Sequence, residues 1–160
     1  MSIKTLKQKN RAVDILLVED NYGDALLVKK AFEKANLNIN VTLAEDGEKA
    51  IAMLTKSGEY SETPTPDLVL LDINLPKLNG KEVLSKIKAQ DALKHIPVIV
   101  LTSSVAEMDV IRSYQLGLNA YLVKPTDLTK LTDIVKGIEA FWFNLVVLPD
   151  NNDITDSNAS

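Results

Sequence analysis

The stretch Leu68-Val69-Leu70-Leu71-Asp72 decides the fold, because four apolar residues end abruptly on an acid. Three other short apolar runs have the same form, and each ends on a polar residue of a different kind: Ile15 to Val18 before Glu19 and Asp20, Val98 to Leu101 before Thr102, and Tyr121 to Val123 before Lys124. Short runs rich in leucine and β-branched residues, separated by helical stretches, are typical of buried parallel strands. Since an open parallel sheet places its ligands at the carboxyl ends of its strands, these polar residues are expected to meet at one edge.

The composition limits the class of protein. A chain of 160 residues has the size of one domain with tails. Its net charge is -4 and its lysines are dispersed, so the sequence lacks the clustered positive charge that binds nucleic acid or an anionic membrane. The absence of cysteine excludes disulfides and thiolate metal sites. Residues 1–11 lack the apolar segment of a signal peptide and no later run is long enough to cross a bilayer, so we expect a cytoplasmic protein.

Strand and helix patterns alternate five times along the chain. Strands are expected over 14–18, 41–44, 68–72, 98–101 and 120–123. Helices are expected over 24–36, 47–56, around Val83 to Ile87, over 106–116, and from a cap at Thr126 or Asp127 to about 144. Residues 57–67 contain Gly58, Pro64 and Pro66 and predict a surface loop inserted before the third strand.

This alternation predicts an α/β fold with a doubly wound, flavodoxin-like parallel sheet of order 2-1-3-4-5 and helices on both faces. We expect a polar leader over 1–11, the folded domain over 12–149 and a disordered acidic tail over 150–160.

The polar residues at the strand ends suit phosphoryl chemistry. The carboxylate of Asp72 is a competent nucleophile if the surrounding negative charge is neutralised. Glu19 and Asp20 are hard oxygen ligands that would hold Mg²⁺, or Mn²⁺ in its place, together with Asp72 and a backbone carbonyl near Asn74. Opposite them, Lys124 would pair with Asp72 at rest and with a phosphoryl group afterwards, while Thr102 would donate its hydroxyl to the same group.

Five ordered elements of this set closely resemble the response-regulator receiver domain of two-component signalling. They are the acid pair Glu19-Asp20, Asp72 with Pro76 and Gly80 behind it, Thr102-Ser103, Tyr121 and Lys124-Pro125, and the match runs from Asp14 to about Phe143. The resemblance implies transfer of a phosphoryl group from a phosphohistidine on a partner kinase to Asp72, dependence on Mg²⁺, and slow self-hydrolysis.

The same resemblance implies a switch rather than a metabolic enzyme, a protein that catalyses only its own phosphorylation and dephosphorylation. Thr102 and Tyr121 would be the coupled switch residues, with Ser103 beside the phosphoryl group, and the bond before Pro125 would be cis. Thr102 and Ser103 are also suited to capping the next helix, and Tyr121 to ordinary packing.

A closer resemblance is to the small regulators of cyanobacterial phytochrome kinases. It rests on Glu19-Asp20-Asn21 followed by Asp24, on the insertion over 57–67, and on the ending Phe141-Trp142-Phe143 with Val146 to Pro149. It implies a stand-alone receiver that forms homodimers and takes its phosphoryl group from a red-light-sensing histidine kinase. The aromatic residues Phe141, Trp142 and Phe143 are the candidate dimer contacts, and the few residues after Leu148 leave no room for a DNA-binding module.

Three other functions share part of this pattern of residues. A phosphorelay intermediate would pass the group on to a histidine phosphotransfer protein, and nothing in the sequence separates it from a terminal regulator. A haloacid dehalogenase-type phosphohydrolase needs a second acid two residues after the nucleophile, where this chain has Asn74. A nucleotide-binding protein would carry a glycine-rich phosphate motif after the first strand, and none is present.

Overall fold

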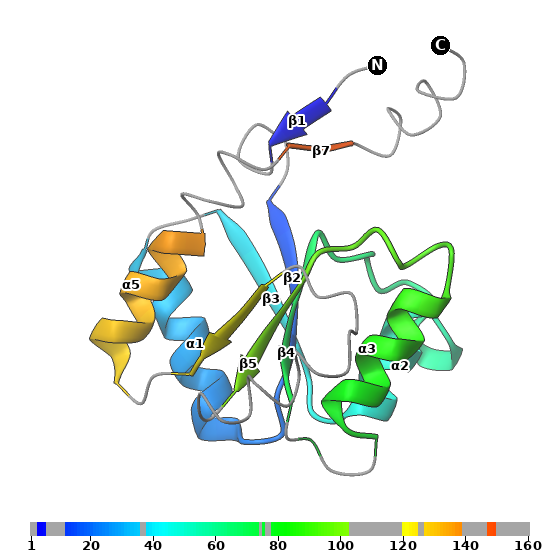
Figure 1. Cartoon of the computed structure of the whole chain (residues 1–160), viewed down its shortest axis with the longest axis horizontal. Coiled ribbons are helices and arrows are strands. Elements are labelled where there is room, and N and C mark those ends of the chain that lie inside the picture. The colour runs from blue at the N-terminus through cyan, green and yellow to red at the C-terminus, as the bar shows by residue number, and fades with distance from the viewer. Residues whose placement is uncertain are drawn as a thin grey trace.

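Five parallel strands form the central sheet of the protein (Figure 1). The computed structural model describes residues 3–5, 12–35, 38–73, 75, 78–102, 120–124, 127–138 and 147–149. The strands are β2 (Val13–Val18), β3 (Ile39–Ala44), β4 (Leu68–Asp72), β5 (Val98–Thr102) and β6 (Ala120–Val123). Their order is β3-β2-β4-β5-β6, which confirms the predicted order 2-1-3-4-5.

Helices cover both faces of this sheet, and alternate strand residues face each layer. Along β2, Ile15 and Leu17 face the core under α1 (Tyr22–Lys34) and α5 (Leu128–Ile138). Leu16 and Val18 face the other core, under α2 (Gly47–Leu54) and α3 (Gly80–Ala89). Figure 1 shows the two helix pairs on opposite sides of the strands. Burial on both faces explains why the strands are continuous apolar runs rather than alternating ones.

Side-chain caps fix where the helices begin. Asn21 accepts a hydrogen bond from the backbone N–H of Asp24 at 3.0 Å, so α1 starts at Tyr22. Asp46 caps α2 in the same way, and Asn79 with Glu82 forms a capping box at α3. Asp127 accepts from the N–H of Lys130 at 2.8 Å, as expected for the cap of the last helix. Each cap satisfies a backbone donor that the first turn of a helix leaves without an intrahelical partner.

The observed boundaries differ from the expected ones at several ends. Helix α1 begins two residues before the expected start and α2 ends at Leu54, because Lys56 adopts a positive φ of 55°. The predicted loop over 57–67 contains a short 3₁₀ helix, η2 (Gly58–Tyr60). The expected helix over 106–116, the extension of the last helix beyond Ile138 and the tail over 150–160 lie outside the described residues.

A second, two-stranded sheet was not predicted. In it β1 (Ile3–Thr5) pairs antiparallel with β7 (Val147–Pro149), with Ile3 opposite Pro149 and Thr5 opposite Val147. Three residues of the expected polar leader are therefore a strand, paired with a segment more than a hundred residues away in the sequence. Among the helices of the described residues, none has the length and apolar character needed to span a membrane.

Candidate functional site

The polar residues of the site lie at the carboxyl ends of strands β2, β4 and β6, where β2 and β4 are neighbours and β5 separates β4 from β6. Asp72 is the last residue of β4, Glu19 and Asp20 follow β2, and Lys124 follows β6. Backbone hydrogen bonds extend the sheet into these positions: Glu19 N donates to the carbonyl of Ala44 at 3.0 Å and Lys124 N to that of Thr102 at 2.7 Å. The carboxyl edge of the sheet therefore holds these side chains on rigid backbone.

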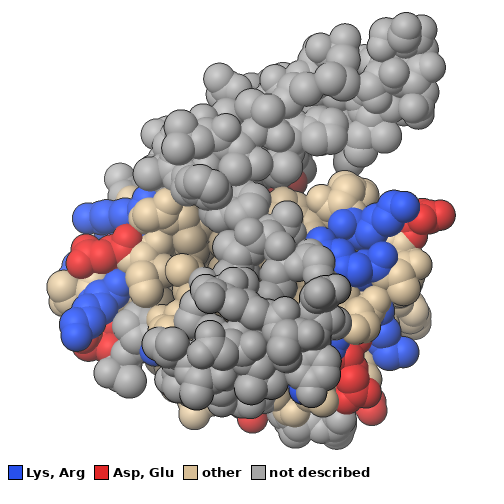
Figure 2. Space-filling view, in the orientation of Figure 1, with Lys and Arg blue, Asp and Glu red and all other residues tan. Residues whose placement is uncertain are grey.

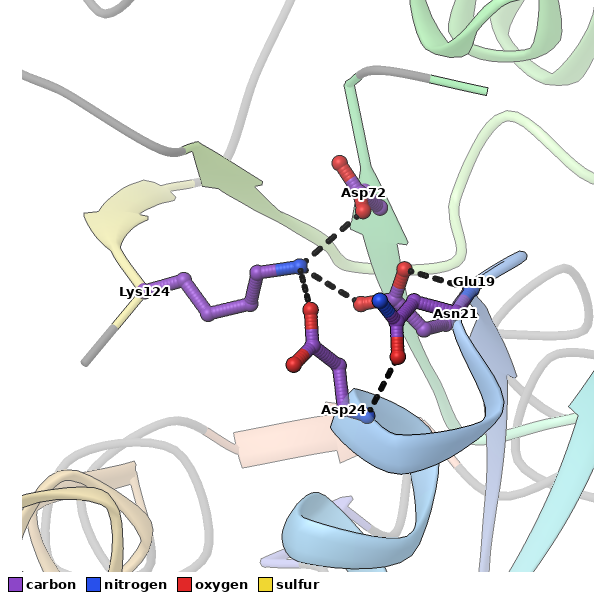
Figure 3. A network of polar contacts seen from close by, with 5 residues as sticks. All are labelled: Glu19, Asn21, Asp24, Asp72 and Lys124. Atoms are coloured by element: carbon purple, nitrogen blue, oxygen red, sulfur yellow. Dashed lines mark hydrogen bonds and ion pairs between the residues drawn. The ribbon is translucent and has the colours of Figure 1, made fainter. Parts of the chain in front are cut away.

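The ammonium group of Lys124 is the centre of the site (Figure 3). Its Nζ lies 2.7 Å from Glu19 Oε1, 3.0 Å from Asp24 Oδ2 and 3.1 Å from Asp72 Oδ2. The pairing of Lys124 with Asp72, expected from the sequence, is thus present, together with two further carboxylates. The second oxygen of Glu19 accepts from the backbone N–H of Asn21 at 3.3 Å.

Three carboxylates, those of Glu19, Asp20 and Asp72, form a cluster at this edge of the sheet. Oxygen atoms of Glu19, Asp20 and Asp72 all lie within 4.8 Å of one another, with Glu19 and Asp72 buried and Asp20 exposed. A cluster of hard oxygen donors, open to solvent at one member, matches what a divalent cation such as Mg²⁺ requires. The donor set of the described residues therefore fits a divalent cation.

Burial and mutual repulsion shift the ionisation of these groups. Burial, together with the hydrogen bond and charge of Asp72, raises the pKa of Glu19 from 4.5 to about 8, although Lys124 opposes this shift. Burial by itself lowers the pKa of Lys124, but hydrogen bonds to Glu19 and Asp24 and the charge of Asp72 outweigh it and raise that pKa above its ordinary value. The lysine is therefore a permanent cation beside carboxylates that compete for it.

One glycine brings another backbone segment close to the phosphoacceptor candidate. Gly80 donates its N–H to the carbonyl of Ile73 at 3.1 Å. A Cβ at position 80 would lie 2.6 Å from Ile73 Cα and 2.7 Å from the carbonyl oxygen of Asp72. Only glycine leaves room for this approach, so Gly80 lies directly against the backbone of Asp72 and Ile73.

The remaining predicted residues fall into two groups. Thr102 is fully buried at the end of β5, opposite Val123 in the strand register. Tyr121 lies in β6, and its side chain is not among those described. Asn74, Ser103, Pro125 with its expected cis bond, and the dimer candidates Phe141, Trp142 and Phe143 lie outside the described residues.

Asp24 is the polar contact that sequence reasoning missed. It lies on α1 rather than at a strand end, so the argument from apolar runs does not reach it. Its position three residues after the cap Asn21 was the available signal, because the third residue of a capped helix lies in the first turn, beside the strand end that precedes the helix.

Comparison with known proteins identifies the class. Residues 15–136 match the response regulator receiver domain family, so the chain belongs to that family of signalling proteins.

Among individual relatives, Response regulator Rcp1 of Synechocystis sp. is 47% identical over 135 residues, covering 84% of this chain and 92% of the relative. A solved structure of the phosphorylated cyanobacterial phytochrome response regulator RcpA superposes with a TM-score of 0.79 at 45% identity, covering 87% of this chain and 99% of that one. The Mn²⁺-bound form of Rcp1 superposes with a TM-score of 0.76 at 46% identity, covering 86% and 99%. The chain is thus related to phytochrome response regulators, as the closer resemblance predicted.

Proposed function

We propose that this protein is a response regulator that accepts a phosphoryl group on Asp72 from a sensor histidine kinase of the phytochrome type. In response it switches a surface that binds another protein. The observation that carries this proposal is the ion pair between Lys124 Nζ and Asp72 Oδ2, at 3.1 Å, beside the cluster of Glu19, Asp20 and Asp72. A nucleophilic carboxylate, a cation opposite it and a hard-ligand cluster are together what phosphoryl transfer to an acid requires.

The chemical step is a displacement at phosphorus. An oxygen of Asp72 attacks the phosphoryl group of a phosphohistidine, an oxygen–phosphorus bond forms, and the phosphorus–nitrogen bond breaks. The electron pair of that bond stays on the imidazole, which takes a proton from solvent. Lys124 holds the carboxylate in place before the attack and donates to a phosphoryl oxygen after it, and the Thr102 hydroxyl donates to another oxygen. Attack of water on the acyl phosphate later regenerates Asp72 and releases inorganic phosphate.

We propose that Glu19, Asp20 and Asp72, with the backbone carbonyl of Asn74, hold Mg²⁺, with Mn²⁺ as a substitute. The cluster of carboxylate oxygens within 4.8 Å supports this assignment, and the relative Rcp1 has a Mn²⁺-bound form. When bound, the cation supplies positive charge that neutralises phosphoryl oxygens.

The relatives support the first of the proposed partners. Because the neighbouring structure RcpA is a cyanobacterial phytochrome response regulator, we propose a phytochrome histidine kinase as the phosphoryl donor. A second copy of the chain is a further proposed partner, bound through Phe141, Trp142 and Phe143. The dispersed lysines and the net charge of -4 favour a protein rather than nucleic acid as the downstream partner.

Intact mass after incubation with acetyl phosphate and Mg²⁺ tests this function. We expect one added phosphoryl mass on the native chain, none on Asp72→Asn, and none when EDTA removes the cation. The matched control is Asp91→Asn, which changes an exposed aspartate on the loop after α3 and should label like the native chain. An adduct that persists in Asp72→Asn would place the acceptor elsewhere, and a native chain that never labels would refute receiver chemistry.

A further inference from the structure

Lys124 uses all of its hydrogen-bonding capacity in this structure. A lysine ammonium has three N–H donors and accepts no hydrogen bond. Its three acceptors here are oxygens of Glu19, Asp24 and Asp72, at 2.7, 3.0 and 3.1 Å. If Lys124 is to donate to a phosphoryl oxygen on Asp72, one of these contacts must be given up.

The three carboxylates differ in how easily they release the lysine. The side chains of Glu19 and Asp72 are 0% and 6% exposed, whereas that of Asp24 is 43% exposed. A buried carboxylate that loses its partner suffers the full cost of desolvation, while an exposed one regains water. The contact with Asp24 is therefore the one that costs least to break.

Asp24 also reaches the lysine from a different direction. It lies on α1, outside the cluster of Glu19, Asp20 and Asp72, and Figure 3 shows it approaching Nζ from the helix rather than from a strand end. Its backbone N–H is fixed by the cap Asn21, at 3.0 Å. This arrangement aims the carboxylate of Asp24 at the lysine without placing it among the phosphoryl ligands.

We infer that Asp24 is a positioning residue that holds Lys124 in the resting arrangement and is displaced when Asp72 becomes phosphorylated. Phosphorylation exchanges the Lys124–Asp24 ion pair for a contact between Lys124 and the phosphoryl group. Asp24 therefore opposes the phosphorylated state by as much as its ion pair stabilises the resting one. This inference rests on the proposed function, because in it Asp24 controls how strongly Lys124 binds the phosphoryl group.

Beryllium fluoride, an analogue of the phosphoryl group, allows the effect to be measured as an equilibrium. We expect Asp24→Asn to bind it about two- to fivefold more tightly than the native chain, the range that an ion pair of this exposure can supply. Asp24→Glu keeps a carboxylate within reach of the lysine and should restore most of the native affinity. The matched control is Glu33→Gln, which removes one negative charge from the exposed far end of α1 and should leave the affinity unchanged.

A double-mutant cycle separates this role from a general charge effect. In a Lys124→Gln background, Asp24→Asn should no longer change the affinity, because the residue acts through the lysine. An equal gain in both backgrounds, or no gain in either, would overturn the inference. If Lys124→Gln binds too weakly to measure, the same four chains are compared by thermal unfolding. Coupling between positions 24 and 124 is expected without ligand, and its absence there would also overturn the inference.

Failure of the proposed function would be distinct from these results. In that case the native chain would bind no beryllium fluoride and form no adduct with acetyl phosphate. If the native chain does both but the double-mutant cycle shows no coupling between positions 24 and 124, only the role of Asp24 would be rejected.

Discussion

Glu19 is a buried carboxylate whose two oxygens are both engaged, one with Lys124 and the other with the backbone N–H of Asn21. It nevertheless has a raised pKa, since burial and Asp72 disfavour its charged form more than Lys124 favours it. A group of this kind opposes folding when it is ionised. A divalent cation that binds the cluster would reverse that effect, because it favours the ionised carboxylate.

The first prediction is a pH dependence of stability in EDTA. The folded pKa of Glu19, about 8, lies above the ordinary value of 4.5. The stabilisation from its protonated form is therefore fully present below about pH 4.5 and is lost as the pH rises toward 8. Urea unfolding at pH 6 and pH 8.5 should show a lower free energy of unfolding at the higher pH.

Glu19→Gln is the control for this pH effect, since the amide does not titrate. The decrease between pH 6 and 8.5 should be smaller in that variant than in the native chain. An equal decrease in both chains would assign the effect to other groups. The affinity for Mg²⁺, measured on the native chain, should rise over the same interval as Glu19 loses its proton.

At the scale of single residues, the sequence predicted the strand-end members of the site and not the helical one. Asp72 and Lys124 could be placed together because parallel strands end at a common edge, whatever the details of the loops. Asp24 was missed because the argument from strand ends does not reach α1, and its contact with Lys124 depends on the rotational phase of that helix, which the cap at Asn21 sets. The tight approach of Gly80 to Ile73 is likewise a property of three-dimensional packing.

At the scale of elements, the end of α2 nearest the site packs on the segment that follows β4. A Cβ at Gly47 would overlap the carbonyl oxygen of Leu78 and lie 2.8 Å from Val83 Cγ2. Both neighbours belong to the connection into α3 or to α3 itself. The first turn of α2 is therefore packed directly against Leu78 and Val83.

Gly47→Ala should consequently destabilise the protein by about 1–3 kcal/mol, because backbone must move to admit the methyl group. The matched control is Gly137→Ala on the exposed side of α5, where an added Cβ meets nothing within 4 Å. That change should stabilise the protein by about 0.5–1 kcal/mol, since alanine is the better helix former. Urea unfolding of the two variants measures both effects, and a neutral Gly47→Ala would contradict the packing argument.

The elements predicted from the sequence were those specified by local pattern. The five parallel strands follow from apolar runs, and the start of α5 follows from its capping residue Asp127, whereas the cap Asn21 and the earlier start of α1 were not predicted. The pair of β1 and β7 does not follow from a local pattern, because its hydrogen bonds join residues 3–5 to residues 147–149. Three-residue segments carry too little periodicity to indicate pairing across such a distance.

At the scale of the whole molecule, exposed apolar side chains concentrate near the site. Among the described residues, the exposed large hydrophobic side chains are Tyr22, Leu26 and Val123, at 73%, 40% and 36% exposure. Tyr22 and Leu26 are four residues apart on α1, so they share one face of its first turns. Figure 2 shows Lys, Arg, Asp and Glu side chains distributed over both sides of the visible face of the molecule. A neighbouring apolar pair beside a reactive edge is thus a candidate contact for a protein donor.

The last prediction distinguishes a protein phosphoryl donor from a small-molecule donor. A kinase must dock before its phosphohistidine reaches Asp72, whereas acetyl phosphate needs only the site itself. Replacing Tyr22 and Leu26 together by alanine should therefore slow transfer from a phosphorylated phytochrome kinase by about tenfold or more, and change labelling by acetyl phosphate by less than about twofold.

The control for this surface is the double variant Lys30→Ala with Glu33→Ala, which alters exposed residues farther along the same helix. It should leave both rates near those of the native chain. A loss of both rates in the Tyr22 and Leu26 variant would show damage to the site rather than to docking. Unchanged transfer from the kinase would instead mean that the donor approaches Asp72 over another surface, with the face of α1 left free in the complex.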